Sequence, residues 1–129
     1  MIALDTNVLL RYFVQDGDHQ AAIATHLIEQ ILSADKPGYI SLPVVCEVVW
    51  AMQTTYRQSR LAIATSLSFL LDSTQVEVEA GEIVAAALGQ TGCDIADAII
   101  HLVGQKYGCT KTITFDKKFA RLAGVELLA

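Results

Sequence analysis

Apolar residues follow two different spacings along the chain, and the two spacings alternate. After His19 they recur every three or four positions, at residues 23, 27, 28, 31 and 32, which predicts a helix over 19–32. The same spacing predicts six further helices, over residues 8–13, 42–56, 59–71, 80–88, 93–107 and 116–122.

Short apolar or β-branched runs lie between these helices and predict five strands, at residues 2–5, 39–40, 76–78, 111–114 and 125–127. Strands that alternate with helices favour a parallel sheet covered by helices on both faces. The sequence therefore predicts an α/β fold with three layers, α/β/α, around a central and mainly parallel sheet of four to five strands. The chain has 129 residues, no internal repeat and no linker, so we expect a single domain over residues 1–129.

A few residues mark where these elements begin and end. Ser41 is an expected N-cap, and Pro43 falls in the first turn of the next helix, where proline is tolerated. Asp16-Gly17-Asp18 predicts a loop, and Gly108 ends the helix before it.

Apolar residues make up 53% of the chain, so a membrane protein has to be considered. The longest runs without Asp, Glu, Lys or Arg are Leu61–Leu71 and Ile83–Cys93, well short of the roughly 18 residues of a spanning helix. The N-terminus lacks the basic segment and apolar stretch of a signal peptide. We therefore expect a cytoplasmic protein that does not enter a membrane.

The cysteines are Cys46, Cys93 and Cys109. Their odd number and the absence of a Cys-x-x-Cys motif argue against a disulfide framework and against a zinc site. We expect free, buried thiols in a reducing compartment.

The formal net charge is −5, but the basic residues are unevenly distributed. Lys106, Lys111, Lys117, Lys118 and Arg121 fall in one stretch that holds a single acid, Asp116. With Arg11, Arg57 and Arg60 these side chains are candidates for contacts to RNA phosphates. The alternative is that they serve ordinary solubility.

Two acidic residues follow predicted strands. Asp5 comes after Ile2-Ala3-Leu4, and Asp116 comes after the strand that contains Thr112-Ile113-Thr114. In open α/β sheets ligands bind beyond the carboxyl ends of strands. Both positions also suit the N-cap of a following helix, so each acid alone leaves a site and a cap as alternatives.

Other acids lie in predicted helices among apolar residues. Glu47 is surrounded by valines, which indicates a paired or metal-bound carboxylate, unless it lies on the solvated face of an amphipathic helix. Asp94, Asp97 and His101 share one helix face. Asp94 is well placed to cap this helix, Asp97 lies too far inside it to do so, and His101 is more typical of a histidine satisfied by the protein.

Four ionised carboxylates at a mean spacing of about 5.5 Å would repel one another by roughly 18 kcal/mol at an effective dielectric of about 20. This exceeds the stability of a typical domain, so such a cluster must take up protons or cations. Hard oxygen ligands suit Mg²⁺ or Mn²⁺, and zinc is disfavoured without cysteine or histidine ligands.

Four motifs follow one another in a fixed order: Leu4-Asp5-Thr6-Asn7-Val8-Leu9, Glu47 in a helix, Asp94-Ile95-Ala96-Asp97-Ala98-Ile99-Ile100, and Thr112-Ile113-Thr114-Phe115-Asp116 with Phe119. In order and rough spacing they resemble the PIN domain nearly from end to end. The chain is most similar to its single-domain bacterial and archaeal version, the VapC-type toxins of toxin–antitoxin pairs. The Asp-Thr-Asn start alone is a weak signal, whereas four ordered motifs are a strong one.

The resemblance implies that Asp5, Glu47, Asp97 and Asp116 are catalytic and bind one or two Mg²⁺ or Mn²⁺ ions. Asp94 fills an accessory position that not every member gives to an acid, and Asn7 and Thr114 match polar positions that support the acids. The resemblance also implies an RNA substrate, a small antitoxin as partner and a homodimer. The expected activity is an endoribonuclease that cleaves RNA with a metal-activated water, leaving a 5′-phosphate and a 3′-hydroxyl.

Two other functions are compatible with parts of this pattern. An aspartate-based phosphotransferase would also place Asp5 after a first strand, but its usual second aspartate is replaced by Asn7 and no phosphate-binding lysine motif is visible. A PIN-like module that binds RNA or a partner without cutting is the non-enzymatic alternative, against which the complete set of acids argues.

Overall fold

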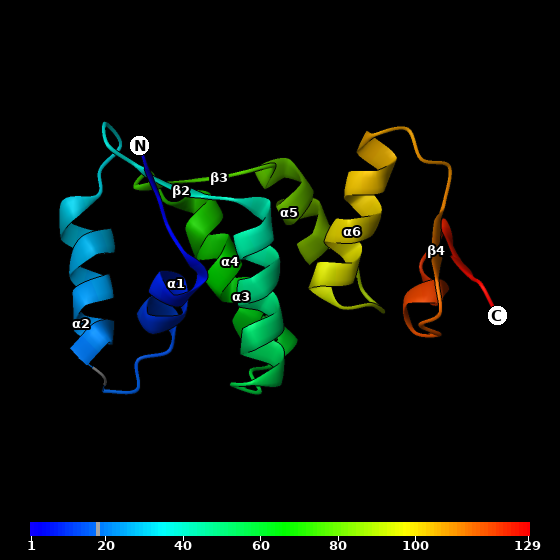
Figure 1. Ribbon diagram of the computed structural model, residues 1–129, viewed down its shortest axis with the longest axis horizontal. Coiled ribbons are helices and arrows are strands. Elements are labelled where there is room, and N and C mark those ends of the chain that lie inside the picture. The colour runs from blue at the N-terminus through cyan, green and yellow to red at the C-terminus, as the bar shows by residue number, and fades with distance from the viewer. Residues whose placement is uncertain (18) are drawn as a thin grey trace. The chain divides into compact units, whose positions relative to one another are not determined.

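The computed structural model describes residues 1–17 and 19–129 (Figure 1). Asp18, in the loop expected at residues 16–18, lies outside the described residues. The chain forms two compact units, Met1–Gly81 and Glu82–Ala129.

The first unit contains a parallel sheet of three strands. Its order is β1 (Ile2–Ala3), β2 (Gly38–Ile40) and β3 (Val76–Val78). Ala3 pairs with Tyr39, and Tyr39 pairs with Glu77. A Cβ atom at Gly38 would lie 2.9 Å from side-chain atoms of Leu4 and of Leu32, so a larger residue here would force these buried leucines to shift.

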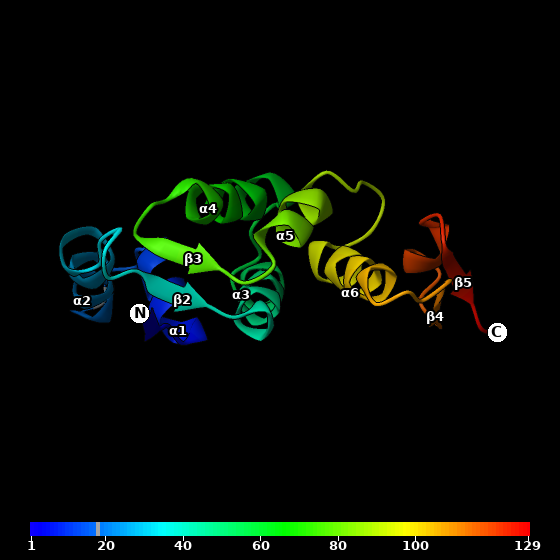
Figure 2. The same ribbon diagram turned by 90° about the horizontal axis from the view of Figure 1, so that it is seen from above.

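Four helices and one π-helical turn complete the first unit. They are α1 (Thr6–Phe13), α2 (His19–His26), the turn η1 (Leu27–Ile31), α3 (Leu42–Thr54) and α4 (Arg60–Asp72). In Figure 2, α4 lies beside β3, with which it is in contact. As predicted, Ser41 caps α3, and its Oγ accepts a hydrogen bond from the Val44 N–H at 3.4 Å. Ser59 caps α4 in the same way.

The core of the first unit is built from the apolar faces of these elements. Leu9 and Leu10 of α1 are buried with Ile40 of β2, and the buried residues of α3 recur at helical spacing. The fully buried side chains are Leu9, Ile28, Ile40, Val45, Val48, Val49, Met52, Leu67 and Leu70. This core fixes the directions of α1 and α3, the helices that carry the candidate acids of this unit.

The second unit contains two helices and a parallel pair of strands. The helix α5 (Gly81–Leu88) begins at the last residue of the first unit and is followed by α6 (Ile95–Lys106). The strands β4 (Thr112–Thr114) and β5 (Val125–Leu127) pair in parallel, and the 3₁₀ turn η2 (Phe119–Arg121) lies between them in sequence. Ile95, Ala98, Ile99 and Phe119 are among the buried residues of this unit.

The predicted α/β class and the parallel pairing of the strands are confirmed. The strands form one sheet of three and one sheet of two, where a single sheet of four to five was expected. Each pairing joins strands of only two or three residues, so it involves few backbone hydrogen bonds.

The helix predictions hold with small changes at the ends. The helix expected at 116–122 is only the 3₁₀ turn Phe119–Arg121, and the helix expected at 19–32 ends in a π-helical turn. None of the helices in the described residues is long and apolar enough to cross a membrane. The cysteines form no disulfide among the described residues, and only Cys93 is fully buried, whereas Cys109 is exposed where a buried thiol was expected.

Candidate functional site

Asp5 lies at the carboxyl end of β1. The N–H of Leu4 still donates to the Tyr39 carbonyl at 2.9 Å, and the chain then turns into α1. Asp5 occupies the N-cap position with extended backbone angles, but its carboxylate makes no capping hydrogen bond. The side chain is exposed and has no protein partner among the described residues, so its charge is available to a ligand.

The neighbouring hydroxyl of Thr6 is also unsatisfied. Thr6 is 8% exposed, and its Oγ1 atom has no hydrogen-bond partner among the described residues. Buried polar atoms are normally paired, and exceptions are typical of functional sites. A polar atom without a partner thus lies next to the first candidate acid in the sequence.

Glu47 lies on α3 and is exposed, while Val45, Val48 and Val49 on the same helix are buried. Its position is therefore the solvated face of an amphipathic helix. Of the two alternatives for Glu47, the solvated helix face describes its position, because the neighbouring valines 45, 48 and 49 point into the core. An exposed carboxylate remains accessible to a cation.

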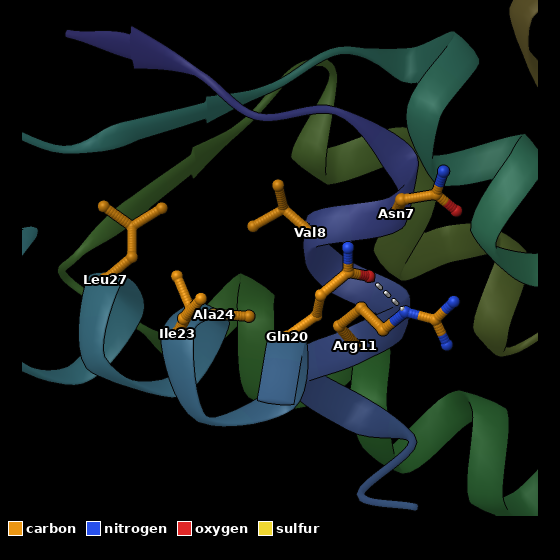
Figure 3. Close-up of a pocket in the computed structure, with 7 residues that line it drawn as sticks. All are labelled: Asn7, Val8, Arg11, Gln20, Ile23, Ala24 and Leu27. Atoms are coloured by element: carbon orange, nitrogen blue, oxygen red, sulfur yellow. Dashed lines mark hydrogen bonds between the residues drawn. The ribbon is translucent and has the colours of Figure 1, made fainter. Parts of the chain in front are cut away.

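Asn7 and Arg11 line a pocket of about 300 Å³ between α1 and α2 (Figure 3). Its other lining residues are Val8, Gln20, Ile23, Ala24 and Leu27. The Arg11 Nε donates to the Gln20 Oε1 at 3.1 Å, and an Arg11 guanidinium nitrogen lies 3.8 Å from the Asp16 carboxylate. Arg11, an expected RNA contact, thus already has protein partners in this unit.

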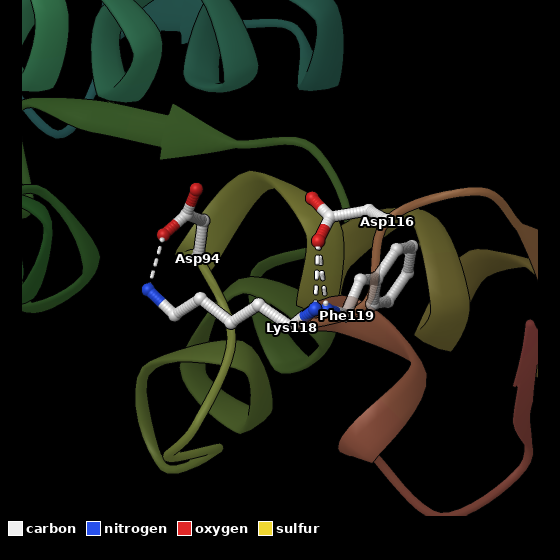
Figure 4. Close-up of polar contacts among 4 residues, drawn as sticks. All are labelled: Asp94, Asp116, Lys118 and Phe119. Atoms are coloured by element: carbon white, nitrogen blue, oxygen red, sulfur yellow. Dashed lines mark hydrogen bonds and ion pairs between the residues drawn. The ribbon is translucent and has the colours of Figure 1, made fainter.

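In the second unit α6 begins at Ile95, so Asp94 is its N-cap and Asp97 lies in its first turn. Asp97 is thus inside the helix and is not its cap, as predicted, although it lies only in the first turn. Asp94 has the position of a cap but makes no side-chain capping bond. Its Oδ1 instead lies 3.3 Å from the Nζ of Lys118 (Figure 4).

Asp97 is half-buried, and its environment disfavours the charged form. Burial raises the pKa of Asp97 above its usual value, and the negative charges of Asp94 and Asp116 raise it further. The ammonium of Lys118 acts in the opposite direction but does not offset them. The second unit thus brings Asp94, Asp97 and Asp116 close enough to repel one another.

Asp116 follows β4 and caps the next turn. Its Oδ1 accepts hydrogen bonds from the N–H groups of Lys118 at 2.9 Å and Phe119 at 3.2 Å (Figure 4). Its own N–H donates to the Thr114 Oγ1 at 3.0 Å. The Thr114 hydroxyl thus contacts the backbone of Asp116, and the Asp116 carboxylate caps the turn that follows.

His101 is buried, with 4% of its surface exposed, and its Nδ1 lies 2.7 Å from the Thr112 Oγ1. The interpretation of His101 as a histidine satisfied by the protein is confirmed. Its hydrogen bond joins α6 to β4 and so helps to hold the helix that carries Asp97.

A family model of the PIN domain matches residues 2–125. The chain belongs to the PIN-domain family. No curated protein gives a significant match to the sequence. PIN domains are generally nucleases, and they typically use divalent metals.

The carboxylates of this PIN domain have the chemistry that a divalent cation requires. All the candidate ligands are hard oxygen donors, which suit Mg²⁺ or Mn²⁺. Burial and the negative charges of Asp94 and Asp116 raise the pKa of Asp97, and a bound cation would favour its ionised form. Within the described residues of either unit, no three side chains of His, Cys, Asp or Glu lie close enough to form a metal site by themselves.

The basic stretch of the PIN domain is partly neutralised. Lys111 contacts Glu126 at 2.8 Å, and Lys106 contacts Glu82 at 3.3 Å. Lys117 and Arg121 are exposed, and no contact to an acid is found for them among the described residues. Of the expected RNA contacts in this stretch, these two side chains are the most accessible to phosphate.

Sequence reasoning missed two polar contacts. Glu79, just after β3, accepts a hydrogen bond from the Leu42 N–H at 2.6 Å and so ties β3 to the start of α3. Lys118 pairs with Asp94, a residue 24 positions earlier in the sequence. No periodicity or capping motif signals either contact, because both depend on the tertiary fold.

Proposed function

We propose that this PIN domain, residues 1–129, is a metal-dependent endoribonuclease. The proposed catalytic ligands are Asp5, Glu47, Asp97 and Asp116. Asp94 is an accessory acid, and Asn7 and Thr114 support the set. The observation that carries the proposal is the gathering of acids near the half-buried Asp97, where Lys118 contacts both Asp94 and Asp116, and where burial and these two carboxylates raise the pKa of Asp97.

The free carboxylate of Asp5 supports the same interpretation. A helix N-cap residue normally uses its side chain to accept a backbone N–H, and Asp5 does not. The N-terminus of α1 also carries a partial positive charge that favours a carboxylate nearby. Asp5 therefore lies where a negative charge is favoured, and its carboxylate has no protein partner among the described residues.

A bound Mg²⁺ or Mn²⁺ ion would activate a water and offset the charge that builds up on the scissile phosphate. The chain's own residues supply the carboxylates that hold it. Thr114 fixes the backbone at Asp116, and Lys117 and Arg121, with Arg11 and Lys118, attract the RNA backbone. Cleavage of this kind leaves a 5′-phosphate and a 3′-hydroxyl.

The finer assignment is a VapC-like toxin in the cytoplasm, blocked by a small antitoxin protein and acting as a homodimer. Exposed Trp50 on α3 and Leu61 on α4 supply apolar surface for such contacts. Expression of the wild-type chain should arrest growth of a bacterial host, and Asp5→Asn should not. Growth arrest by both proteins would reject the toxic-nuclease assignment.

The decisive experiment is a cleavage assay on total cellular RNA with Mg²⁺, Mn²⁺ or EDTA. Asp5→Asn and Asp97→Asn should each lower the rate at least about 100-fold, as loss of an electrostatic catalytic group commonly does. Asp72→Asn is the matched control, because Asp72 is exposed at the end of α4 and should leave the rate near that of the wild type.

The outcomes separate the alternatives. Cleavage that requires the metal and disappears in Asp5→Asn establishes the nuclease, and the mapped ends then identify its target. A 2′,3′-cyclic phosphate product would reject the proposed mechanism. RNA binding without cleavage by any preparation would favour the non-catalytic PIN-like module.

A further inference from the structure

Lys118 contacts two of the three acids in the second unit. Its backbone N–H donates to the Asp116 Oδ1 at 2.9 Å, while its ammonium Nζ lies 3.3 Å from the Asp94 Oδ1. Figure 4 shows the lysine stem extending from the Asp116 turn to the start of α6. One residue therefore links the turn after β4 to the N-terminus of the helix that carries Asp97.

The ammonium of Lys118 also acts on Asp97. It is the positive charge that lowers the pKa of Asp97, against burial and the two neighbouring carboxylates that raise it. Lys106 and Lys111 pair instead with Glu82 and Glu126. Within the described part of this unit, the ammonium of Lys118 thus acts on Asp94 and Asp97, while its backbone N–H binds Asp116.

We propose that Lys118 is a built-in countercation that occupies the acidic site in the metal-free protein and leaves it when a divalent cation binds. This inference rests on the proposed function, because it takes these acids to be metal ligands. Without some cation, the three carboxylates would repel one another and push α6 away from the turn after β4. The lysine limits that repulsion and at the same time competes with the metal.

A divalent cation can displace Lys118 from its ion pair with Asp94. About 60% of the Lys118 side chain and 38% of the Asp94 side chain are exposed. Exposed ion pairs contribute little to stability, so a divalent cation with more charge and stronger oxygen ligation can displace the ammonium. Lysine also carries a compact charge on a flexible stem, which can move away without disturbing the backbone.

The side chain of Lys118 can be tested separately from its backbone. The hydrogen bond from its N–H to Asp116 does not involve the side chain, so Lys118→Met keeps the turn and removes the charge. Lys118→Arg keeps the charge. Lys117→Met is the matched control, because it removes the same charge from the adjacent exposed residue, for which no contact to these acids is found among the described residues.

The experiment is a titration of each full-length protein with Mn²⁺, followed by electron paramagnetic resonance of the free ion. Circular dichroism would check that each variant is folded. Lys118→Met should lower the Kd for Mn²⁺ by about three- to tenfold, the size expected for removing one charge roughly 6 Å from a divalent ion in a solvated site. Lys117→Met should change the Kd for Mn²⁺ less than about twofold, because a more distant charge acts more weakly on the ion. The Kd of Lys118→Arg should stay near that of the wild type.

Equal changes in Lys118→Met and Lys117→Met would show only an effect of net charge and would overturn the inference. Weaker Mn²⁺ binding by Lys118→Met would also overturn it, because Lys118 would then stabilise the metal-bound state. If the wild type binds no Mn²⁺, this inference fails together with the proposed metal ligands. If the Mn²⁺ affinities change as expected but no RNA is cut, the inference about Lys118 is supported and the nuclease assignment fails.

Discussion

The imidazole of His101 and the hydroxyl of Thr112 lie 2.7 Å apart and connect the middle of α6 to the start of β4. His101 is almost fully buried, so its polar nitrogen requires a protein partner. This pair secures the helix of Asp97 to the strand that leads to Asp116. It is therefore a structural contact at the base of the candidate site.

Replacing Thr112 by valine should destabilise the protein. The change conserves shape but leaves the Nδ1 of His101 without its partner, and a buried unsatisfied group of this kind costs about 1–3 kcal/mol. The measurement is the free energy of unfolding in urea. Thr110→Val is the control, because Thr110 is exposed and should change the stability by less than about 0.5 kcal/mol. Equal stabilities for the two variants would show that the His101 contact contributes nothing.

Gly124 should tolerate a side chain less well than Gly108. Both glycines have a left-handed backbone, with φ of +86° and +85°, which costs about 1–2 kcal/mol for an alanine. A Cβ at Gly124 would also lie 3.0 Å from the Cε1 of His101, whereas a Cβ at Gly108 would meet nothing within 4 Å.

Gly124→Ala should therefore lower the free energy of unfolding by about 1 kcal/mol more than Gly108→Ala, the lower end of the range for overpacking. Thermal or urea unfolding of both variants measures the difference, in which the shared backbone effect cancels. A Gly108→Ala variant as unstable as Gly124→Ala would show that the ring of His101 moves aside freely.

Asp116 should show two separable roles. Asp116→Asn keeps an oxygen that can accept from the Lys118 and Phe119 N–H groups, so it should change stability by less than about 0.5 kcal/mol. Asp116→Ala removes both hydrogen bonds and should cost about 1 kcal/mol. If Asp116 is a metal ligand, both variants should lose at least about 100-fold in cleavage rate. If Asp116→Asn cleaves RNA at the wild-type rate, measured at equal protein concentration, Asp116 is not a metal ligand and only caps the turn.

Much of the local structure could be predicted because its causes are local. The serine N-cap at 41 and the helical spacing of the valines in α3 depend on residues within one or two turns. The same holds for the acids that follow β1 and β4, since a strand that ends in a polar residue is visible in the sequence. The parallel pairing followed from the alternation of strands and helices.

The features that could not be predicted depend on contacts between distant residues. The sequence left the direction of Glu47 open, because residues that are neighbours in sequence point to different sides of a helix and need not surround the side chain in space. The pairing of Lys118 with Asp94 and of Glu79 with Leu42 joins segments 24 and 37 residues apart. The division of the strands between two sheets has the same origin, since strand patterns do not specify which edges pair.

Tyr12 should make the stability of the protein sensitive to alkaline pH. Its hydroxyl donates to the Glu29 Oε2 at 2.9 Å, and its ring contacts Phe13 and Phe69 at centroid distances of 5.2 and 6.0 Å. Burial raises the pKa of Tyr12 from 10.0 to about 12, and the hydrogen bond to Glu29 and the charge of Glu29 act in the same direction.

Because the folded protein holds this proton up to about pH 12 while the unfolded chain releases it near pH 10, the stabilisation is complete below pH 10 and is lost as the pH rises through 12. Tyr12 is only partly buried, so screening by solvent reduces the effect to about 1 kcal/mol. Between pH 9 and pH 12 the wild type should therefore lose about 1 kcal/mol more of its free energy of unfolding than Tyr12→Phe loses. Tyr107→Phe is the control, because Tyr107 is 82% exposed and should follow the wild type. Parallel pH profiles for all three proteins would show that the Glu29 contact does not hold the Tyr12 proton.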